Sequence, residues 1–254
     1  MIVTLTVVAL GLLLGLKIGR KNAYSEANEN SSTDTLVAKR IYNLIILDES
    51  GSMHGLEEVS ITGVNETLKT IRAAYEEFPQ QEQFVTFATF SGEPYYDTNT
   101  CRVKRELQPI AEITDLTLPE YKPGGLTPLW DTMGKLFNEL DKQTGTDDLV
   151  LVTIITDGYE NSSVRYNADK IKKLITRLDE KGWVFTYIGA NQDASKVASE
   201  VGIKNFLEYT SDKAGTREMY RRENNVRSRF YQNSRVGTQM ERLQSGYFNE
   251  DDNK

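Results

Sequence analysis

The sequence predicts an α/β fold, namely a doubly wound, mostly parallel sheet with helices on both faces, preceded by an N-terminal transmembrane helix. Two observations predict the sheet. Apolar runs that fit strands alternate along the chain with amphipathic stretches that fit helices, and the runs are nearly continuous, which is typical of strands buried on both faces. A third observation, the uncharged apolar stretch at residues 1–16, predicts the membrane helix.

The composition limits the classes of protein to which the chain can belong. Its 254 residues, 39% of them hydrophobic, suffice for one large domain or two small ones. The single cysteine, Cys101, excludes an intramolecular disulfide framework and a cysteine-based zinc cluster, and the single histidine, His54, excludes a site that needs two imidazoles. The net charge of −7 argues against nucleic acid as a partner of the whole chain.

The N-terminal segment is predicted to anchor the protein in a membrane. Sixteen residues of helix reach about 24 Å, slightly less than a bilayer core of about 30 Å, and we extend the anchor to residues 1–19 because Lys17 can reach toward the headgroups. Basic residues follow the apolar stretch at Lys17, Arg20 and Lys21. The positive-inside rule then predicts a single-pass protein with its main domain in the cytoplasm. A cleaved signal peptide is the alternative, although its basic residues would normally precede the apolar run.

Three glycines spaced four apart lie in this segment, at Gly11, Gly15 and Gly19. Such spacing can let two membrane helices approach closely, which makes self-association one interpretation; small residues in a generic span are the other. Residues 20–37 are polar and rich in Asn, Ser and Glu, and they predict a flexible linker. Residues 38–211 form the predicted globular domain.

The first half of this domain is expected to contain three strands and two helices. Ile41–Leu47 reads IYNLIIL, a nearly continuous apolar run, and predicts a buried strand. In Leu56–Phe78 apolar residues recur on one helical face and a proline lies just past the end, which predicts a helix. Phe84–Phe90 is the second buried strand. Cys101–Leu107 mixes charged with apolar residues, as an edge strand does, and Thr127–Leu140 is the second helix.

The second half repeats the alternation. Leu149–Thr156 reads LVLVTIIT and is the clearest buried strand, and Ala168–Leu178 has the pattern of an amphipathic helix. We expect a strand at Trp183–Gly189, a helix at Asp193–Val201 and a short last strand at Asn205–Tyr209. Ligands of open parallel sheets bind at the carboxyl ends of the strands, so a functional site is expected there.

Three segments at these strand ends carry oxygen-bearing side chains. The first strand runs into Asp48, Ser50 and Ser52, a Gly-Gly-Leu-Thr-Pro turn holds Thr127, and Asp157 follows the clearest buried strand. Carboxylates and hydroxyls without His or Cys are hard oxygen ligands, which suit Mg²⁺, Mn²⁺ or Ca²⁺. We therefore predict a metal site. Simple capping of the first helix by Asp48 and Ser50 is the alternative.

Residues 41–209 resemble the von Willebrand factor A (vWA) domain. The stretches IYNLIILDESGSM, GGLTPLWD and VTIITDGYEN carry the resemblance, and five residues match the family's metal-ion-dependent adhesion site (MIDAS) in order: Asp48, Ser50, Ser52, Thr127 and Asp157. The stretch TYIGANQDA is similar to a subgroup of bacterial domains of this type without a well-defined activity. We therefore expect a bacterial, membrane-anchored vWA protein.

The resemblance implies a function and a ligand. The cation would be Mg²⁺, with Mn²⁺ or Ca²⁺ as other choices, and a partner protein would supply an acidic side chain to complete its coordination. The expected function is a membrane-tethered, metal-dependent protein–protein interaction module of scaffold or adhesion type. Ser50, Ser52 and Thr127 would offer neutral oxygens, whereas Asp48 and Asp157 would supply negative charge, directly or through water.

Four polar neighbours of these residues have other expected roles. Asp131 is predicted either to bind a metal ligand or to cap or pair on the helix surface. Glu160 and Asn161 are expected to stabilise the turn after Asp157. Glu49 is expected to be solvated or to contact a metal ligand.

We predict no enzymatic activity. An aspartyl-phosphate phosphatase normally needs a second Asp two residues after Asp48, where this chain has Ser50, and no phosphate-binding loop motif occurs. The only histidine, His54, lies in the same loop as the serines, which is a poor geometry for a relay, and we expect it at the surface. Cys101 is expected to pack near the edge strand. A phosphate-ester hydrolase that uses the same carboxylates is the alternative.

Residues 212–254 are predicted to form a basic, helical C-terminal tail. Seven arginines between residues 217 and 242 are interleaved with aromatic residues. The tail could dock on lipid, nucleic acid or an acidic protein, but we favour a helix that packs its aromatic side on the domain with the arginines solvated. Residues 38–211 carry 18 basic and 27 acidic side chains, a net charge of −9, and residues 212–254 carry nine and seven, a net charge of +2.

Overall fold

A computed structural model describes residues 40–92, 101–190, 194–234 and 247–248, all within one compact unit, residues 35–254. The predicted membrane anchor at 1–19, with Gly11, Gly15 and Gly19, and the predicted linker at 20–37 lie outside the described residues. Among the residues that are described, no helix is long and apolar enough to cross a membrane. The anchor therefore stays a prediction.

The core of the fold is a six-stranded sheet with the order β3-β2-β1-β4-β5-β6. The strands are β1 (Arg40–Asp48), β2 (Glu82–Phe90), β3 (Cys101–Pro109), β4 (Leu149–Thr156), β5 (Trp183–Ala190) and β6 (Asn205–Tyr209). All neighbouring strands pair in parallel except β3, which runs antiparallel to β2 at one edge. The mostly parallel sheet and the edge position of the strand that begins at Cys101 are thus confirmed.

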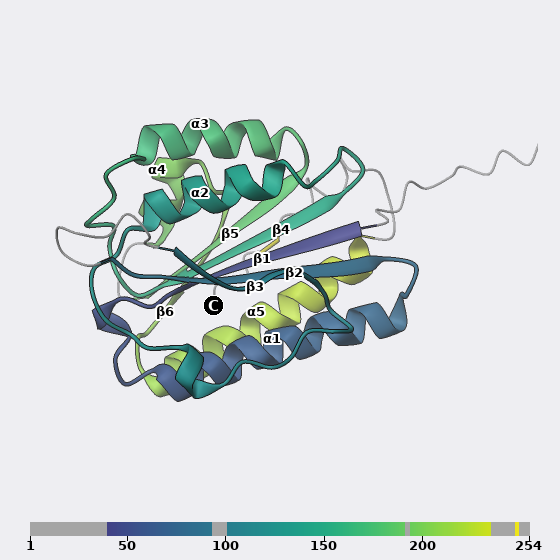
Figure 1. Cartoon of the computed structure of the whole chain (residues 1–254), viewed down its shortest axis with the longest axis horizontal. Helices are drawn as coiled ribbons and strands as arrows, with labels where there is room; N and C mark the ends of the chain where they lie inside the picture. Colours follow the sequence, from purple (N-terminus) through teal and green to yellow (C-terminus); the bar gives the residue numbers. More distant parts are fainter. Residues whose placement is uncertain (1–39, 93–100, 191–193, 235–246, 249–254) are drawn as a thin grey trace, which may run out of the picture. The chain divides into compact units, whose positions relative to one another are not determined.

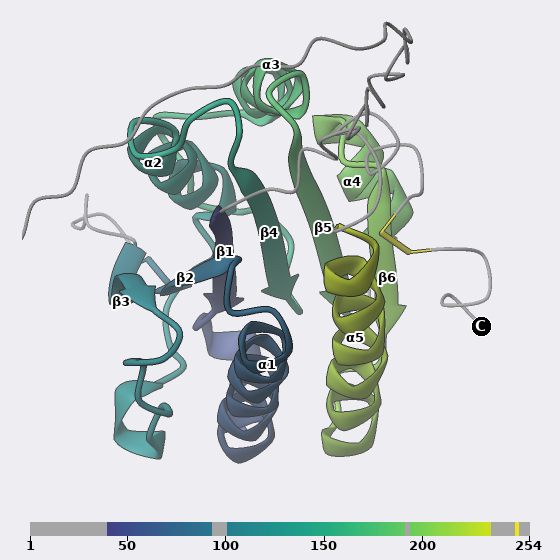
Figure 2. The ribbon, with the colours of Figure 1, turned by 90° about the vertical axis from the view of Figure 1, so that its right-hand side faces the viewer.

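Helices cover both faces of the sheet (Figures 1 and 2). One face carries α1 and α5 and the other carries α2, α3 and α4. Their bounds are α1 (Glu57–Glu77), α2 (Leu129–Asp141), α3 (Ala168–Asp179), α4 (Ala194–Val201) and α5 (Lys213–Asn233), and two short 3₁₀ turns, η1 (Gly51–Met53) and η2 (Leu118–Glu120), lie in loops. The doubly wound arrangement predicted from the sequence is confirmed.

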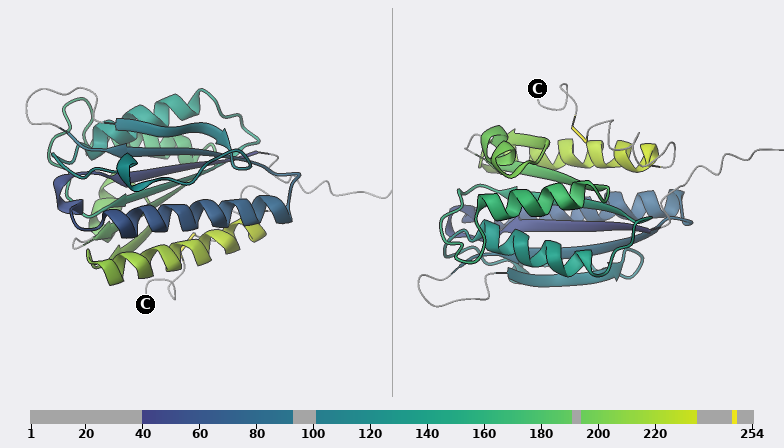
Figure 3. Two further views of the ribbon diagram at one scale, coloured as in Figure 1. Left: turned by 60° about the horizontal axis from the view of Figure 1, so that its bottom comes forward. Right: turned by 90° about the horizontal axis from the view of Figure 1, so that it is seen from above.

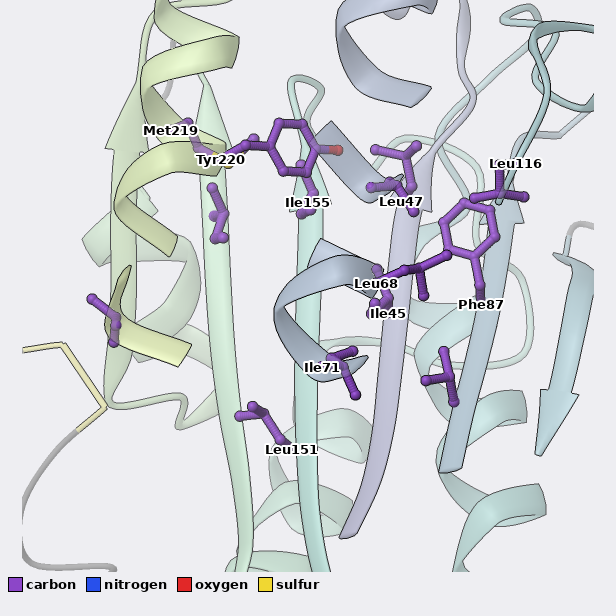
Figure 4. Close-up of a cluster of buried hydrophobic side chains, with 14 of the residues drawn as sticks. Ile45, Leu47, Leu68, Ile71, Phe87, Leu116, Leu151, Ile155, Met219 and Tyr220 are labelled. Carbon is purple, nitrogen blue, oxygen red and sulfur yellow. The ribbon is translucent and has the colours of Figure 1, made fainter. Parts of the chain in front are cut away.

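The continuous apolar run of β1 is explained by burial on both faces. Ile45 and Leu47 pack in the cluster on the α1 and α5 side, which Figure 4 shows together with Leu68 of α1 and Met219 of α5. Leu44 belongs to the cluster on the other side, under α2 and α3. Because successive side chains of a strand point to opposite faces, a central strand with two covered faces needs an apolar residue at nearly every position.

One helix starts later than the sequence predicts. The helix expected from Thr127 begins at Leu129, with Pro128 at the position before the first helical residue. The ring of a proline disfavours helical backbone in the residue before it, so Thr127 stays in the loop. The prolonged loop places the Thr127 side chain at the edge of the sheet, where the candidate site lies.

Helix α5 packs beside α1 over the sheet (Figure 3). The aromatic side of the predicted tail is buried, with Tyr220 at 3% and Tyr231 at 1% exposure, as we expected for a packed terminal helix. The expectation that its arginines are solvated is wrong for Arg227, which is fully buried. The sequence division at residue 211 falls between β6 and α5, inside the compact unit.

Arg227 is buried because other elements supply its hydrogen-bond partners. Its Nη2 donates to Thr153 Oγ1 of β4 (2.7 Å), its Nη1 donates to Asn43 Oδ1 of β1 (3.2 Å) and its Nε donates to Glu223 Oε1 one turn earlier in α5 (2.9 Å). The hydroxyl of Tyr231 accepts from Nη1 and donates to Asn43. This polar group, which we call the Arg227 network, ties α5 to the two central strands.

The lone cysteine offers a first test of the fold. Cys101 is 3% exposed, and burial raises the pKa of its thiol to about 11. Because the thiolate is the reactive form, we expect a native thiolate fraction about 100-fold below that of an exposed cysteine, and negligible labelling by a thiol reagent such as DTNB at pH 8. In denaturant one equivalent should react. Rapid stoichiometric labelling of the native protein would contradict the buried position.

Candidate metal centre

Three loops meet where the parallel strands end. Asp48 is the last residue of β1 and lies beside Thr156, the last residue of β4, since Leu47 and Ile155 are paired. Two backbone hydrogen bonds hold the loop before α2 against the loop after β1: Gly51 N–H donates to Gly125 O (3.0 Å), and Gly124 N–H donates to Glu49 O (2.9 Å). The edge that the sequence predicted to carry the site is therefore a set of connected loops.

The loop before α2 depends on a glycine. Gly125 has a φ of +78°, and a Cβ at this position would lie 2.3 Å from the carbonyl oxygen of Gly92. Gly92 and Leu126 form an isolated antiparallel bridge, with both N–H groups donating. Only glycine adopts this backbone conformation readily and allows so close an approach. The bridge places the next residue, Thr127, at the site.

The structure brings the five predicted side chains together. Ser50 Oγ lies 3.1 Å from Ser52 Oγ, and Ser52 Oγ donates to Asp157 Oδ1 at 2.5 Å. The other residues are located by Gly158: a Cβ built there would lie 3.0 Å from Thr127 Oγ1, 3.4 Å from Ser52 Oγ and 3.6 Å from Asp48 Oδ2. Oxygens from three separate segments thus surround one small space beside Gly158, which an added methyl group would crowd. We call these side chains the five-oxygen cluster.

The cluster holds two carboxylates without a cationic side chain. Asp48 is fully buried, and burial, together with the nearby Asp157, raises its pKa to about 6 in spite of hydrogen bonds from Ser50 N–H (2.7 Å) and the Thr156 hydroxyl (2.5 Å). Throughout the described ranges, no Lys or Arg forms an ion pair with either carboxylate. Burying a carboxylate without a partner is costly, so a cation bound here would be stabilised.

The donor set fits a hard divalent cation. Hydroxyl and carboxylate oxygens suit Mg²⁺, Mn²⁺ or Ca²⁺, whereas zinc sites use mainly His and Cys. In the part of the chain that the structure describes, no group of three or more His, Cys, Asp or Glu gathers as a metal cage. A cation at the five-oxygen cluster would therefore depend on three hydroxyls in addition to two carboxylates, and would keep coordination positions for water or another ligand.

The predicted turn residues stabilise the loop after β4. Asn161 Oδ1 accepts from Thr127 N–H (2.8 Å), and Glu160 accepts from the N–H groups of Ser162 (2.8 Å) and Ser163 (2.7 Å) and from Trp130 N–H (2.9 Å). The turn role of Glu160 and Asn161 is confirmed.

Asp131 stabilises the same loop from α2. Its carboxylate accepts from the N–H groups of residues 164, 165 and 166 at 2.7–2.9 Å. Asp131 was predicted either to bind a metal ligand or to cap or pair on the helix surface. It does neither, because the N–H groups that it binds belong to the loop after β4. Asp131 is 8% exposed.

Glu49 and His54, both in the segment after β1, differ in their exposure to solvent. Glu49 is 2% exposed and accepts from Thr89 Oγ1, from Arg102 Nη1 (3.1 Å) and from Lys122 N–H (2.6 Å), so the expectation that it is solvated is wrong. His54 is exposed, as predicted, and lies 3.4 Å from Glu57.

Three residues that support the cluster were not predicted from the sequence. Thr156 donates to Asp48, Ser211 Oγ donates to Asp157 Oδ2 (3.0 Å), and Tyr121 Oη donates to the Asp48 carbonyl (2.6 Å). Of these, Thr156 could have been anticipated, since it ends the strand beside β1. The other two come from distant parts of the chain, so no local pattern identifies them.

Comparison with known proteins supports the fold. The family model described as von Willebrand factor type A domain matches residues 44–225. No curated protein matches the sequence. Among solved structures, similar folds occur in the PilB minor pilin from Streptococcus sanguinis (TM-score 0.55, 10% identity, 75% of this chain and 62% of that one) and in proximal thread matrix protein 1 from the mussel byssus (TM-score 0.52, 13% identity, 76% and 47%).

A third similar structure is the pilus adhesin SpaC from Lactobacillus rhamnosus GG, with a TM-score of 0.52, 11% identity and coverage of 76% of this chain. The chain spans 30% of SpaC and about half of the matrix protein. At these identities the likeness concerns the fold alone.

Proposed function

The chain belongs to the von Willebrand factor type A domain family, and we propose that it is a membrane-tethered protein-interaction module that binds an acidic side chain of a partner protein through a divalent cation. Asp48, Ser50, Ser52, Thr127 and Asp157 would hold the cation, with Mg²⁺ as the first choice. The predicted anchor at residues 1–19 would attach the module to the membrane, with its main domain in the cytoplasm.

One observation carries the metal part of this proposal. Three of the five side chains have oxygens within 3.6 Å of a single point beside Gly158, and the other two are linked to them by short contacts. Among the residues that the structure describes, no Lys or Arg pairs with either carboxylate. The open coordination positions and the excess of hydroxyls would leave the ion electrophilic, so that it could accept a carboxylate from outside.

The similar structures are consistent with an interaction role. Two of them are by their descriptions a pilus adhesin and a minor pilin, and the third is a matrix protein of the mussel byssus. The imidazole of His54 is exposed and lies beside Glu57 rather than beside Ser50 or Ser52, so it is not placed to activate either serine as a nucleophile. A serine without a base is a poor nucleophile.

Calorimetric titration of the full-length protein in mild detergent with Mg²⁺ tests the metal site. We expect saturable binding to the wild type and at least a tenfold loss of affinity in Gly158→Ala, because this variant keeps all five donors but adds a methyl group 3.0 Å from Thr127 Oγ1. The matched control is Gly124→Ala in the neighbouring loop, where a Cβ meets nothing within 4 Å, and its affinity should equal that of the wild type.

Two results would contradict the metal site. The first is a wild type that binds neither Mg²⁺, Mn²⁺ nor Ca²⁺, and the second is a Gly158→Ala variant that binds as well as the wild type. The interaction part is tested separately by affinity capture. The wild type should recover a partner protein in Mg²⁺ but not in EDTA. The Gly158→Ala variant should not recover it, and the wild type should not recover a form of the partner whose acidic residue is replaced by alanine.

A further inference from the structure

We propose that the exposed face of helices α1 and α5 binds the same face of a second copy of this chain, which makes the protein a dimer with two-fold symmetry. The two-fold axis runs parallel to the helices and places α1 of each copy against α5 of the other. The dimer forms whether or not a cation occupies the five-oxygen cluster, so it goes beyond the proposed function.

A groove of about 690 Å³ lies between α1 and α5. Gly63 of α1 and Tyr220 of α5 line it where the two helices touch, and the ring of Tyr220 leaves no space for a Cβ on Gly63. In the left view of Figure 3 the two helices lie side by side, and no other described element lies in front of them. The described part of the chain therefore leaves the groove open to a partner.

Each wall of this groove carries charges of one sign. The α1 wall is acidic, with Glu58 and Glu66, and the α5 wall is basic, with Lys213, Arg217 and Arg221; all five residues are exposed. Within each wall they are four or eight residues apart, so they lie in one row along their helix. Among the described residues no ion pair crosses the groove, and of these five only Arg221 pairs, with a glutamate of its own helix. The opposite charges of the two rows therefore stay available for a partner.

The two rows are complementary to each other in a two-fold dimer. α1 and α5 run in the same direction, because each begins where one of the parallel strands β1 and β6 ends. A two-fold axis along this direction keeps it and exchanges the two walls, so that the acidic row of each copy meets the basic row of the other.

The opposite charges also lie at similar heights along this axis. Heights are counted from the contact of Gly63 with Tyr220, at about 1.5 Å per helical residue. Glu66 and Arg221 then differ by about 3 Å in height, and Glu58 and Lys213 differ by about 3 Å as well. Long, flexible side chains span such differences, so both ends of the acidic row find a cation in the second copy.

Other arrangements and other partners fit this face less well. A two-fold axis that crosses the helices would place α1 against α1 and α5 against α5, and like charges that face each other are costly. An anionic membrane or a nucleic acid would attract the basic row but would be repelled by Glu58 and Glu66 beside it. A second copy in the parallel arrangement satisfies both rows at once.

The size of the face suits a dimer. α1 and α5 contain 21 residues each, so both are about 31 Å long. Two packed helices with their side chains are about 20 Å wide, which gives a flat area of about 600 Å². A stable interface buries about 800 Å² of accessible surface on each partner, and the accessible surface of a face exceeds its flat area. The two helices therefore offer enough surface for a specific dimer.

The direction of the axis agrees with the predicted anchor. Arg40 begins β1, and Asp48 of the candidate metal centre ends it. α1 and α5 run back along the sheet, so an axis parallel to them keeps both Arg40 residues at one end of the dimer and both metal centres at the other. Two chains anchored in one membrane by residues 1–19 can pair in this way, and the shared membrane raises their effective concentration.

Sedimentation velocity of the full-length protein, in a nonionic detergent with EDTA, tests the dimer. The wild type should sediment as a dimer at low salt and dissociate as NaCl rises to about 1 M, because salt screens exposed charges. A single exposed pair contributes little, so each variant reverses two charges. Glu58→Lys, Glu66→Lys and, separately, Lys213→Glu, Arg221→Glu should each weaken dimerisation by about tenfold or more, since like charges then meet in both halves of the interface.

An equimolar mixture of the two variants should dimerise like the wild type, because the basic α1 of one variant then meets the acidic α5 of the other. The matched control is Lys172→Glu, Lys173→Glu on the exposed surface of α3, across the sheet, which changes the net charge as the α5 variant does and should dimerise like the wild type.

Three results would overturn the dimer: a monomeric wild type, a wild-type dimer that neither salt nor charge reversal weakens, and a mixture of the two variants that stays monomeric. The second is the result expected if the chains associated only through Gly11, Gly15 and Gly19. None of them bears on the proposed function, because the Mg²⁺ titration with Gly158→Ala tests the metal site independently of the oligomeric state.

Discussion

Replacing Arg227 with alanine is expected to lower the free energy of unfolding by about 3–5 kcal/mol. The substitution leaves the Glu223 carboxylate buried without its cationic partner and removes donors from Asn43 and Thr153. Glu223 is 1% exposed, so water cannot replace the guanidinium. Chemical denaturation followed by circular dichroism measures the loss, provided that the denaturant dependence is unchanged.

A surface arginine of the same helix provides the control. Arg217 is exposed, and Arg217→Ala should change stability by no more than about 0.5 kcal/mol. The double variant Arg227→Met, Glu223→Met should recover part of the loss, because it removes the orphaned charge while leaving Asn43 and Thr153 without their donor. An Arg227→Ala variant as stable as Arg217→Ala would mean that the Arg227 network does not hold α5 to the sheet.

Replacing Asp48 with asparagine is expected to have opposite effects on the metal-free and the metal-loaded protein. In EDTA at pH 7 the variant should be more stable than the wild type by about 2–3 kcal/mol, since burial raises the Asp48 pKa to about 6 and each pKa unit corresponds to about 1.4 kcal/mol. In saturating Mg²⁺ the order should reverse, because the wild type gains the free energy of metal binding and the variant does not.

The effect of the Asp48 charge on stability depends on pH in a direction that the raised pKa fixes. A carboxyl whose pKa is higher in the folded than in the unfolded state binds its proton more tightly when folded. The contribution of Asp48 to the stability of the metal-free wild type should therefore fall as the pH rises from about 4 to about 7, through the raised folded pKa, and should be constant above that range. Denaturation midpoints of wild type and Asp48→Asn in EDTA should converge toward pH 4 and diverge toward pH 7.

Asp141→Asn is the matched control for Asp48→Asn. Its carboxylate pairs with Arg177 and Lys181 at the surface, which lowers its pKa in spite of partial burial, so its replacement should slightly destabilise the protein and leave the response to Mg²⁺ unchanged. An Asp48→Asn variant that is less stable than the wild type in EDTA would contradict the view that the Asp48 charge is poorly compensated.

The sequence predicted the sheet well because its signal is local. The bounds of the strands Leu149–Thr156 and Asn205–Tyr209 agree with the structure at both ends. A strand covered on both faces has to be apolar at nearly every position, and that requirement is visible within the strand itself. The meeting of Asp48 and Asp157 follows from the same topology, since parallel strands end at a common edge, whereas Thr127 is brought there by the bridge between Gly92 and Leu126.

The details that the sequence did not predict depend on partners far along the chain. Nothing near Arg227 distinguishes it from the solvated arginines of α5; it is buried because Asn43 and Thr153 lie beneath it, 184 and 74 residues away. Glu49 was expected to be solvated or to contact a metal ligand, but its carboxylate is buried and accepts from Thr89 and Arg102 on two other strands. Such pairings are decided by tertiary contacts and leave no pattern in a single sequence.

The central strand β1 also sets the mechanical behaviour of the domain. Arg40 and Asp48 lie at its two ends, about 26 Å apart at the usual rise per residue. A force transmitted between the N-terminal side of Arg40 and a partner held at Asp48 would act along this strand. The hydrogen bonds of β1 to β2 and β4 would then be loaded in shear and would have to break together rather than one after another. The pairing of β1 with two parallel neighbours therefore makes the domain resistant to tension along this strand, the direction in which the proposed tether and partner site would pull.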